Sequence, residues 1–188
     1  MEDKKIKVKF YNPRDFAENK HDRVDRKPYG GGPGMVIQAE PVIRAVESVK
    51  SKVKSKTKII WLTPNGEQFT NEYAKKIAGK CDDIIIICGR YEGIDARVKK
   101  AFRVEEVSVG PFVLTGGELA AEIMIDVISR QVEGVLGDFN SLEESRVSSA
   151  DVYTRPEVFK YKGKNFRVPK ILLSGHRAKI DEWKQSLK

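Results

Sequence analysis

The chain has 188 residues, of which 40% are hydrophobic and 33% charged, and its formal net charge is +8. This length and apolar content suit one domain with a core, or one domain with a small appendage, while the absence of a membrane-length apolar run and of a secretory signal predicts a cytoplasmic protein. Its two cysteines and two histidines exclude a disulfide framework and a zinc-type cluster. Its positive charge has two interpretations: the protein binds a polyanion such as nucleic acid, or it has an ordinary solvated surface rich in lysine.

The first third of the chain predicts a strand, a long loop and a helix. Residues 6–10 alternate apolar and basic side chains, which is typical of a half-exposed strand. Residues 14–29 are rich in charge and have no apolar period, and long loops of this kind are often functional. Apolar residues at helical spacing predict an amphipathic helix over 40–54.

The middle of the chain alternates strands and helices. We expect a buried strand over 58–62, ended by the turn residues 63–66, and a helix that Thr70 begins and Gly79 ends. The β-branched run at 84–87 fits a parallel strand covered on both faces, and a further strand is expected within 104–109. This alternation predicts an α/β fold with an open, mostly parallel sheet.

A helix is expected from Glu118 to about residue 132, with two rows of residues facing inward: Leu119, Ile123 and Val127, and Ala120, Met124 and Ile128. The polar stretch 137–150 has no period and predicts a mobile linker between a main domain, 1–136, and a small appendage, 151–188. We expect the appendage to be mainly helical, with a short strand at 170–173 and a helix from about Ala178 to Leu187.

Three segments, residues 27–35, 88–95 and 108–118, hold nine of the 15 glycines. Glycine lets a ligand approach the main chain closely, so these segments predict either a binding site built from backbone or simple tight turns. Ligands of open α/β sheets bind beyond the carboxyl ends of strands, where 63–64, 89–91 and 108–117 all fall, so we expect one shared pocket. Because Walker and Rossmann fingerprints are absent, a pocket for an adenine and a sugar fits better than a phosphate cradle.

Charged residues near the end of the 118–132 helix allow two interpretations. Glu122, Asp126 and Arg130 share one helix face, where they could form an ordinary surface charge ladder. Alternatively, Arg130 points into the site and stabilises a developing oxyanion. Glu143 and Glu144 in the linker are either solvated or placed to remove a substrate proton.

Seven ordered segments resemble the bacterial tRNA (guanine-N1)-methyltransferases, which belong to the SPOUT class and modify the guanine after the anticodon. The resemblance runs through nearly the whole chain, in residues 27–35, 62–66, 88–95, 108–118, 129–137, 153–157 and 172–175. It implies S-adenosylmethionine as methyl donor, a deep trefoil knot and a homodimer whose sites are shared between subunits. Carried over residue by residue, the donor site would comprise Leu62, Pro64, Gly89, Tyr91, Glu92, Gly93, Ser108, Val109, Gly110, Pro111, Phe112, Val113, Leu114, Gly116 and Gly117.

The resemblance also implies the catalytic pair. Arg130 matches the family arginine that steadies the target guanine, and Glu144 best matches the family's catalytic aspartate, although an ungapped count places Ser145 there. The family has a strand and a helix before Ile6 and more helix after Leu187, so the tRNA-contacting C-terminal domain is expected to be truncated. The basic loop 23–27 and residues 160–170 are the expected tRNA contacts. The sequence makes no prediction about a divalent ion.

Three alternatives to this interpretation remain open. The chain could be a non-catalytic or impaired tRNA-binding relic of the family, or a fragment of a longer enzyme. It could also be another SPOUT enzyme, acting on ribosomal RNA or on a ribose hydroxyl.

Overall fold

The computed structural model describes residues 5–53, 56–136 and 151–187. Its contacts divide the chain into two compact units, residues 1–137 and 138–188. None of the helices in the described ranges is long and apolar enough to cross a membrane.

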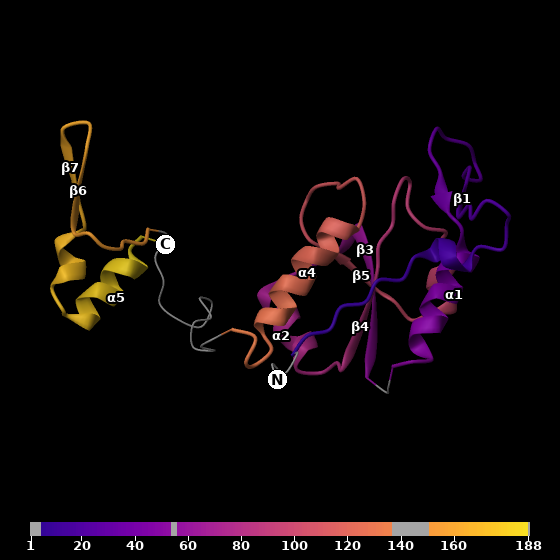
Figure 1. Cartoon of the computed structure of the whole chain (residues 1–188), viewed down its shortest axis with the longest axis horizontal. Helices are drawn as coiled ribbons and strands as arrows, with labels where there is room; N and C mark the ends of the chain where they lie inside the picture. Colours follow the sequence, from indigo (N-terminus) through magenta and orange to yellow (C-terminus); the bar gives the residue numbers. More distant parts are fainter. Residues whose placement is uncertain (1–4, 54–55, 137–150, 188) are drawn as a thin grey trace. The chain divides into compact units, whose positions relative to one another are not determined.

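A three-stranded parallel sheet forms the centre of the first unit (Figure 1). Strand β3 (Thr57–Gln68) lies in the middle, between β4 (Asp83–Ile87) and β5 (Glu105–Ser108). The register pairs Ile59 with Ile85 and Leu62 with Val107. β-branched side chains favour such strands because they pack well on a pleated surface. The predicted parallel α/β sheet is therefore confirmed.

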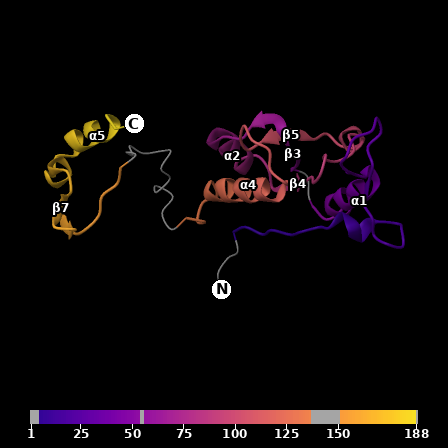
Figure 2. The same ribbon diagram turned by 90° about the horizontal axis from the view of Figure 1, so that it is seen from above.

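Helices cover both faces of this sheet. Alternate residues of β3 point to opposite faces, so Ile59 and Trp61 join one core cluster and Ile60 joins the other. The first cluster packs under α1 (Ala39–Lys50) and the short helix α3 (Val98–Ala101), and the second under α2 (Asn71–Ala78) and α4 (Glu118–Arg130). Figure 1 shows α1 on one side of the sheet and α2 with α4 on the other, and Figure 2 shows the same elements from above.

The helix boundaries follow local signals. The Thr70 side chain accepts a hydrogen bond from the Tyr73 backbone N–H (3.2 Å), and Gly79 follows the last turn of α2, as predicted. Helix α1 ends at Lys50, four residues before the expected end. The loop ahead of it contains only short elements, the 3-10 helix η1 (Pro13–Phe16) and the paired strands β1 (Asp25–Arg26) and β2 (Val36–Ile37).

Two predictions for strands of the first unit are wrong. Residues 6–10 form no strand, and their apolar side chains are exposed. An alternating pattern fixes side-chain spacing but supplies no hydrogen-bonding neighbour, and these residues have no ladder partner among the described strands. The turn at 63–66 also does not end β3: Leu62 and Glu67 both pair with Val107, so the chain loops out and rejoins β5.

Helix α4 buries one of its two predicted apolar rows completely and the other only at Val127, which packs half-buried against the second core cluster. Ala120, Met124 and Ile128 are buried, whereas Leu119 and Ile123 are 56% and 43% exposed. A helix lying on a sheet covers one stripe of its surface, and here that stripe is completed by Ala121 instead of the outer row.

Within the described residues 151–187, the second unit contains a β-hairpin, a 3-10 turn and one helix. Strands β6 (Val158–Tyr161) and β7 (Lys164–Arg167) pair antiparallel, and α5 spans Arg177–Gln185, close to the predicted helix. The hairpin was not predicted. The strand expected at 170–173 is wrong, because these residues form the 3-10 helix η4 (Lys170–Leu173), closed by the bond from the Leu172 backbone N–H to the Pro169 carbonyl (3.0 Å).

Candidate functional site

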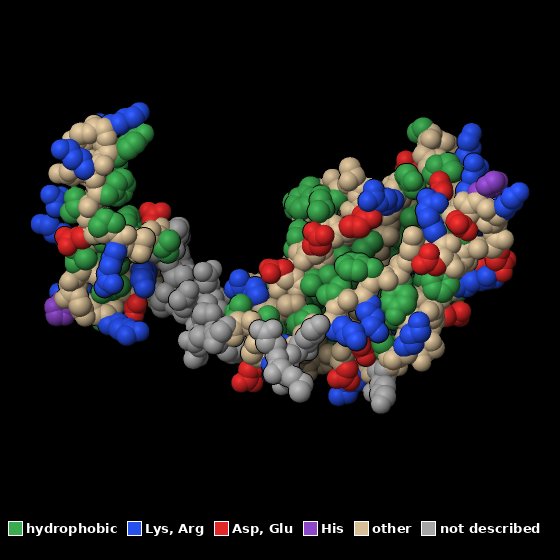
Figure 3. Space-filling view, viewed as in Figure 1, with side chains coloured by type: hydrophobic (Ala, Val, Ile, Leu, Met, Phe, Trp, Pro, Cys, Tyr) green, Lys and Arg blue, Asp and Glu red, His purple; other side chains and the backbone are tan. Residues whose placement is uncertain are grey.

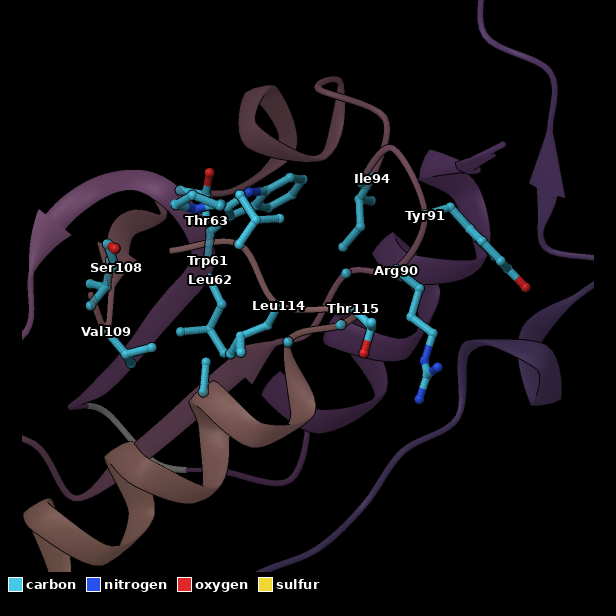
Figure 4. A pocket seen from close by; sticks show the side chains of 18 of the residues that line it. Trp61, Leu62, Thr63, Arg90, Tyr91, Ile94, Ser108, Val109, Leu114 and Thr115 are labelled. Carbon is cyan, nitrogen blue, oxygen red and sulfur yellow. The ribbon is translucent and has the colours of Figure 1, made fainter. Parts of the chain in front are cut away.

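A cavity of about 340 Å³ lies where the loops after β4 and β5 meet the looped-out part of β3 (Figure 4). This is the carboxyl edge of the parallel sheet, where ligands of such folds bind. The structure therefore brings together the three loops that sequence spacing placed in one pocket. The volume is within the range of small-molecule sites.

Most of the predicted donor-site residues line this cavity. They are Leu62, Pro64, Gly89, Tyr91, Glu92, Gly93, Ser108, Val109, Phe112, Val113, Leu114, Gly116 and Gly117. Gly110 and Pro111 belong to the same loop but are not among the lining residues.

Thr63, Arg90 and Thr115 also line the cavity, as expected from the pocket segments 63–64, 89–91 and 108–117. Four further lining residues lie outside these segments and the predicted donor-site residues: Trp61, Ile94, Val107 and Ala120. The first three directly adjoin a predicted donor-site residue in the sequence, whereas Ala120 lies in the first turn of α4. In Figure 4, Trp61 and Leu62 come from β3, while Leu114 and Thr115 come from the loop before α4.

The 89–95 loop holds an unusual backbone conformation. Tyr91 has φ +57°, the left-handed region that non-glycine residues rarely occupy, and Gly93 has φ +109°. The end of the first glycine-rich segment and the residues just after it hydrogen-bond to this loop. The Glu92 backbone N–H donates to the Met35 carbonyl, and the Ile37 N–H donates to the Gly93 carbonyl (both 3.0 Å). Segment 27–35 thus supports the cavity wall without lining it.

The third glycine-rich segment is packed against the second. The Gly117 backbone N–H donates to the Gly89 carbonyl (2.9 Å). A Cβ on Gly117 would lie 2.8 Å from the Cys88 Cα, which is a backbone atom with little freedom to move. On Gly110, a Cβ would overlap the Phe112 ring. Close packing against backbone therefore requires glycine at position 117, whereas at position 110 a side chain would require the half-exposed Phe112 ring to move.

The buried Ser108 shapes the start of this loop. Its hydroxyl donates to the Gly110 carbonyl (3.0 Å), while its own carbonyl accepts from the Phe69 N–H (2.7 Å). These bonds satisfy polar groups that would be costly to bury unpaired. The cavity wall is consequently formed before any ligand arrives.

One ion pair joins the loop after β4 to the first residue of helix α4. The Arg90 Nε donates to Glu118 Oε1 (2.8 Å), at the first residue of α4, and both side chains are about half exposed. Burial, with a smaller contribution from the Glu118 charge, raises the pKa of the nearby Cys88 thiol to about 11. Cys88 is therefore a neutral thiol at neutral pH and a poor nucleophile.

Of the predicted catalytic pair, the structure describes only Arg130, which is not among the residues that line this cavity. Arg130 is half-buried at the last turn of α4, ten residues beyond the cavity-lining Ala120, a separation of about 15 Å along a helix axis. Glu144 and Ser145 lie outside the described residues.

Comparison with known proteins identifies relatives along the entire chain. A family model described as "tRNA (Guanine-1)-methyltransferase TrmD" matches residues 1–188. A protein of Thermomicrobium roseum named tRNA (guanine-N(1)-)-methyltransferase is 48% identical over 97% of the chain and 67% of its own length. Proteins of the same name from Dehalococcoides mccartyi and Campylobacter jejuni are 45% and 43% identical, over 96% and 99% of the chain and 72% and 80% of their own lengths.

Proposed function

The chain belongs to the tRNA (guanine-1)-methyltransferase family TrmD, and from that membership we propose its reaction and mechanism. It is an S-adenosylmethionine-dependent enzyme that methylates N1 of a guanine in tRNA, the guanine at position 37 on the 3′ side of the anticodon. The observation that carries this proposal is a preformed cavity at the carboxyl edge of the sheet in a chain that matches the family from end to end.

The cavity fits the proposed donor chemically. Its wall combines apolar side chains, such as Leu62 and Leu114, with glycine backbone at residues 89, 116 and 117. Apolar walls suit an adenine ring, and exposed backbone N–H and C=O groups can bond its polar edge and the ribose. When bound, the donor supplies an electrophilic methyl group on its sulfonium sulfur.

The protein mainly has to position two substrates and move one proton. N1 of guanine carries an amide-like proton and is a poor nucleophile at neutral pH. We assign its removal to the carboxylate of Glu144, because a glutamate carboxylate in water is ionised near neutral pH. Arg130 balances the negative charge that grows on guanine O6 as the proton leaves N1, and bonding of the methyl group to N1 then removes that charge.

A second copy of the chain would complete this site. Arg130 and the cavity lie at opposite ends of α4, so one chain alone separates the donor from the proposed arginine. Leu119 and Ile123 on α4, with Phe112 and Val113 just before it, leave an exposed apolar surface. Hydrophobic side chains gather in Figure 3 over this region of the first unit. Such a patch is typical of an interface, so we propose a homodimer with sites shared between subunits.

The finer features implied by the family are part of the proposal. We propose that the loops around Gly89 and Gly117 belong to a trefoil knot, supported by the bridge between Arg90 and Gly116. Residues 1–136 would then bind the donor, and residues 151–188 would contact tRNA. Because its substrate is tRNA, we expect the enzyme to work in the cytoplasm.

Methyl transfer to an unmodified tRNA transcript tests the proposal. We expect donor methyl incorporation at guanine N1 by the wild-type chain. Glu144→Gln should lower the rate by about 10²–10⁴-fold, because a positioned base contributes that much. Arg130→Ala should lower it by about 10²–10³-fold, the typical effect of losing one group that stabilises a developing oxyanion.

Ser145→Ala is the matched control for the base assignment. A loss in Ser145→Ala equal to that in Glu144→Gln would contradict Glu144 as the base. No incorporation by the wild-type chain, with tRNA still bound, would identify a non-catalytic relic instead.

A further inference from the structure

The β-hairpin of the second unit leaves an unusual group of side chains exposed. Phe159, Tyr161 and Phe166 are 55%, 57% and 45% exposed. Isolated exposed apolar residues are ordinary, but three aromatic rings on one short hairpin form a patch that costs free energy in water.

The pairing register places these rings on one face of the hairpin. Phe159 is paired with Phe166 and Tyr161 with Lys164, and directly paired residues of antiparallel strands point to the same face. The Phe159 and Phe166 rings stack, with centroids 5.1 Å apart and planes inclined by 12°. Two parallel rings at the surface leave their outer faces available to a third flat ring.

The charge of the hairpin is entirely positive. Residues 158–167 contain three lysines and one arginine and no acidic residue. Lys162, in the turn, lies over the Tyr161 ring with its Nζ 5.4 Å from the ring centroid. Figure 3 shows hydrophobic and basic side chains together at the hairpin end of this unit. A partner that complements this surface must be both flat and anionic.

Unpaired nucleotides have this combination of properties. A splayed-out base stacks on an aromatic side chain, and its phosphate is attracted to lysines beside the ring. Paired bases in an RNA helix present no free ring face, so the surface selects unpaired nucleotides. A second copy of this chain would bring another basic hairpin or need an acidic patch opposite, which makes RNA the better complement.

We propose that Phe159, Tyr161 and Phe166 form a stacking platform for an unpaired base of the tRNA substrate, with Lys162 and Lys164 on the adjoining phosphates. This inference rests on the proposed function, because it takes tRNA as the substrate. It adds a base-stacking site to the general tRNA contact proposed for residues 151–188.

Affinity for a tRNA transcript at several salt concentrations separates stacking from charge. Phe159→Leu and Tyr161→Leu keep apolar volume but remove the ring, so each should weaken the Kd by about 5- to 150-fold per stacked base. The slope of log affinity against log salt should stay unchanged in both. Lys164→Gln should instead make that slope shallower by about 0.7–0.9, the loss of one phosphate contact.

Two variants control for damage to the hairpin. Phe159→Tyr keeps the ring and should retain wild-type affinity. Asn165→Ala lies on the opposite face of the same hairpin and should also leave affinity unchanged. Two results would overturn the platform in favour of a structural role for the aromatic rings. One is that Asn165→Ala weakens tRNA binding as much as Phe159→Leu does, and the other is that Phe159→Tyr loses wild-type affinity.

Photo-crosslinking provides a direct readout. A transcript carrying 4-thiouridine in its loops should crosslink to the platform rings, with the linked peptide identified by mass spectrometry. Wild-type chain that binds and methylates tRNA, without such a crosslink and without a loss in the leucine variants, would refute the platform and leave the proposed function standing. Failure of the wild type to bind tRNA would refute both. A change in sedimentation of Phe159→Leu would assign the surface to an interface between copies.

Discussion

The two units of this chain are built on different physical principles. The first has a parallel sheet with a packed cluster on each face, in which Ile60, Val98, Val107 and Met124 are almost completely inaccessible to solvent. In the second, none of the residues described between 151 and 187 is buried to a comparable degree. The second unit is held by local contacts, including the β6–β7 ladder and the tilted ring contact of Tyr153 with Trp183 (centroids 6.4 Å apart).

This difference suits two kinds of binding. A densely packed sheet can hold loops in strained conformations, such as Tyr91 in the left-handed region, and so keep a cavity ready for a small molecule. A unit of this small size buries too little apolar surface for much independent stability. Its exposed rings and charges are instead available to a large partner, whose binding would supply stabilisation that the unit itself lacks.

The largest effect should come from a matched pair of isoleucine truncations. Ile60→Ala opens a cavity in the sheet core and should lower the free energy of unfolding by about 2–5 kcal/mol. Ile180 is only half-buried in helix α5, so Ile180→Ala should lower the free energy of unfolding by less than about 1 kcal/mol. Chemical denaturation measures both. Equal losses would show that the second unit has a core as important as that of the first.

The preformed cavity predicts the next largest effect. Gly117→Ala forces the 89 and 117 segments apart, because its Cβ would lie 2.8 Å from the Cys88 Cα. We expect S-adenosylmethionine binding to weaken by about 5- to 150-fold in calorimetry, since overpacking a tight site typically costs about 1–3 kcal/mol. Gly79→Ala is the control: its Cβ would have only an ordinary contact of 3.5 Å, at the end of α2. Unchanged donor affinity in Gly117→Ala would contradict a rigid, preformed site.

A smaller effect is expected for the ion pair that joins the cavity loops. Glu118→Gln removes the charge that pairs with Arg90. Because both side chains are about half exposed, water screens the pair and the free energy of unfolding should fall by about 0.2–1 kcal/mol. The loss should shrink in high salt. A loss above this range, insensitive to salt, would show that the pair is more protected than its exposure suggests.

The smallest effect concerns acid stability of the first unit. Burial, the largest single influence, would raise the pKa of Glu105, but the ion pair with Lys58, the Tyr73 hydroxyl and the charge of Lys76 together hold the pKa below the ordinary value of 4.5. A carboxyl whose pKa is lowered by folding stabilises the fold above its unfolded pKa, and this contribution is lost as the pH falls through the folded pKa. Glu105→Gln should therefore be slightly less stable at neutral pH, by less than about 1 kcal/mol. The difference should disappear in acid unfolding experiments, and a difference that grows in acid would reverse the assignment.

The sequence determined those features whose signals are local. Thr70 and Gly79 mark the ends of α2 because a cap depends on a few neighbouring backbone groups. The isoleucine run of β4 and the turn-forming segments after the strands also predicted the buried sheet and the loops that line the cavity, since strand ends of a parallel sheet share one edge.

Only the tertiary structure decided which partner each segment found. Residues 6–10 alternate apolar and basic side chains but have no ladder neighbour among the described residues. Strand β3, in contrast, continues past its turn because Glu67 pairs with Val107 of β5. Leu119 and Ile123 have the helical spacing of a core row, but the stripe of α4 that meets the sheet is the one containing Met124. Periodicity specifies which side chains share a face, and packing against other elements then determines which of those faces is buried.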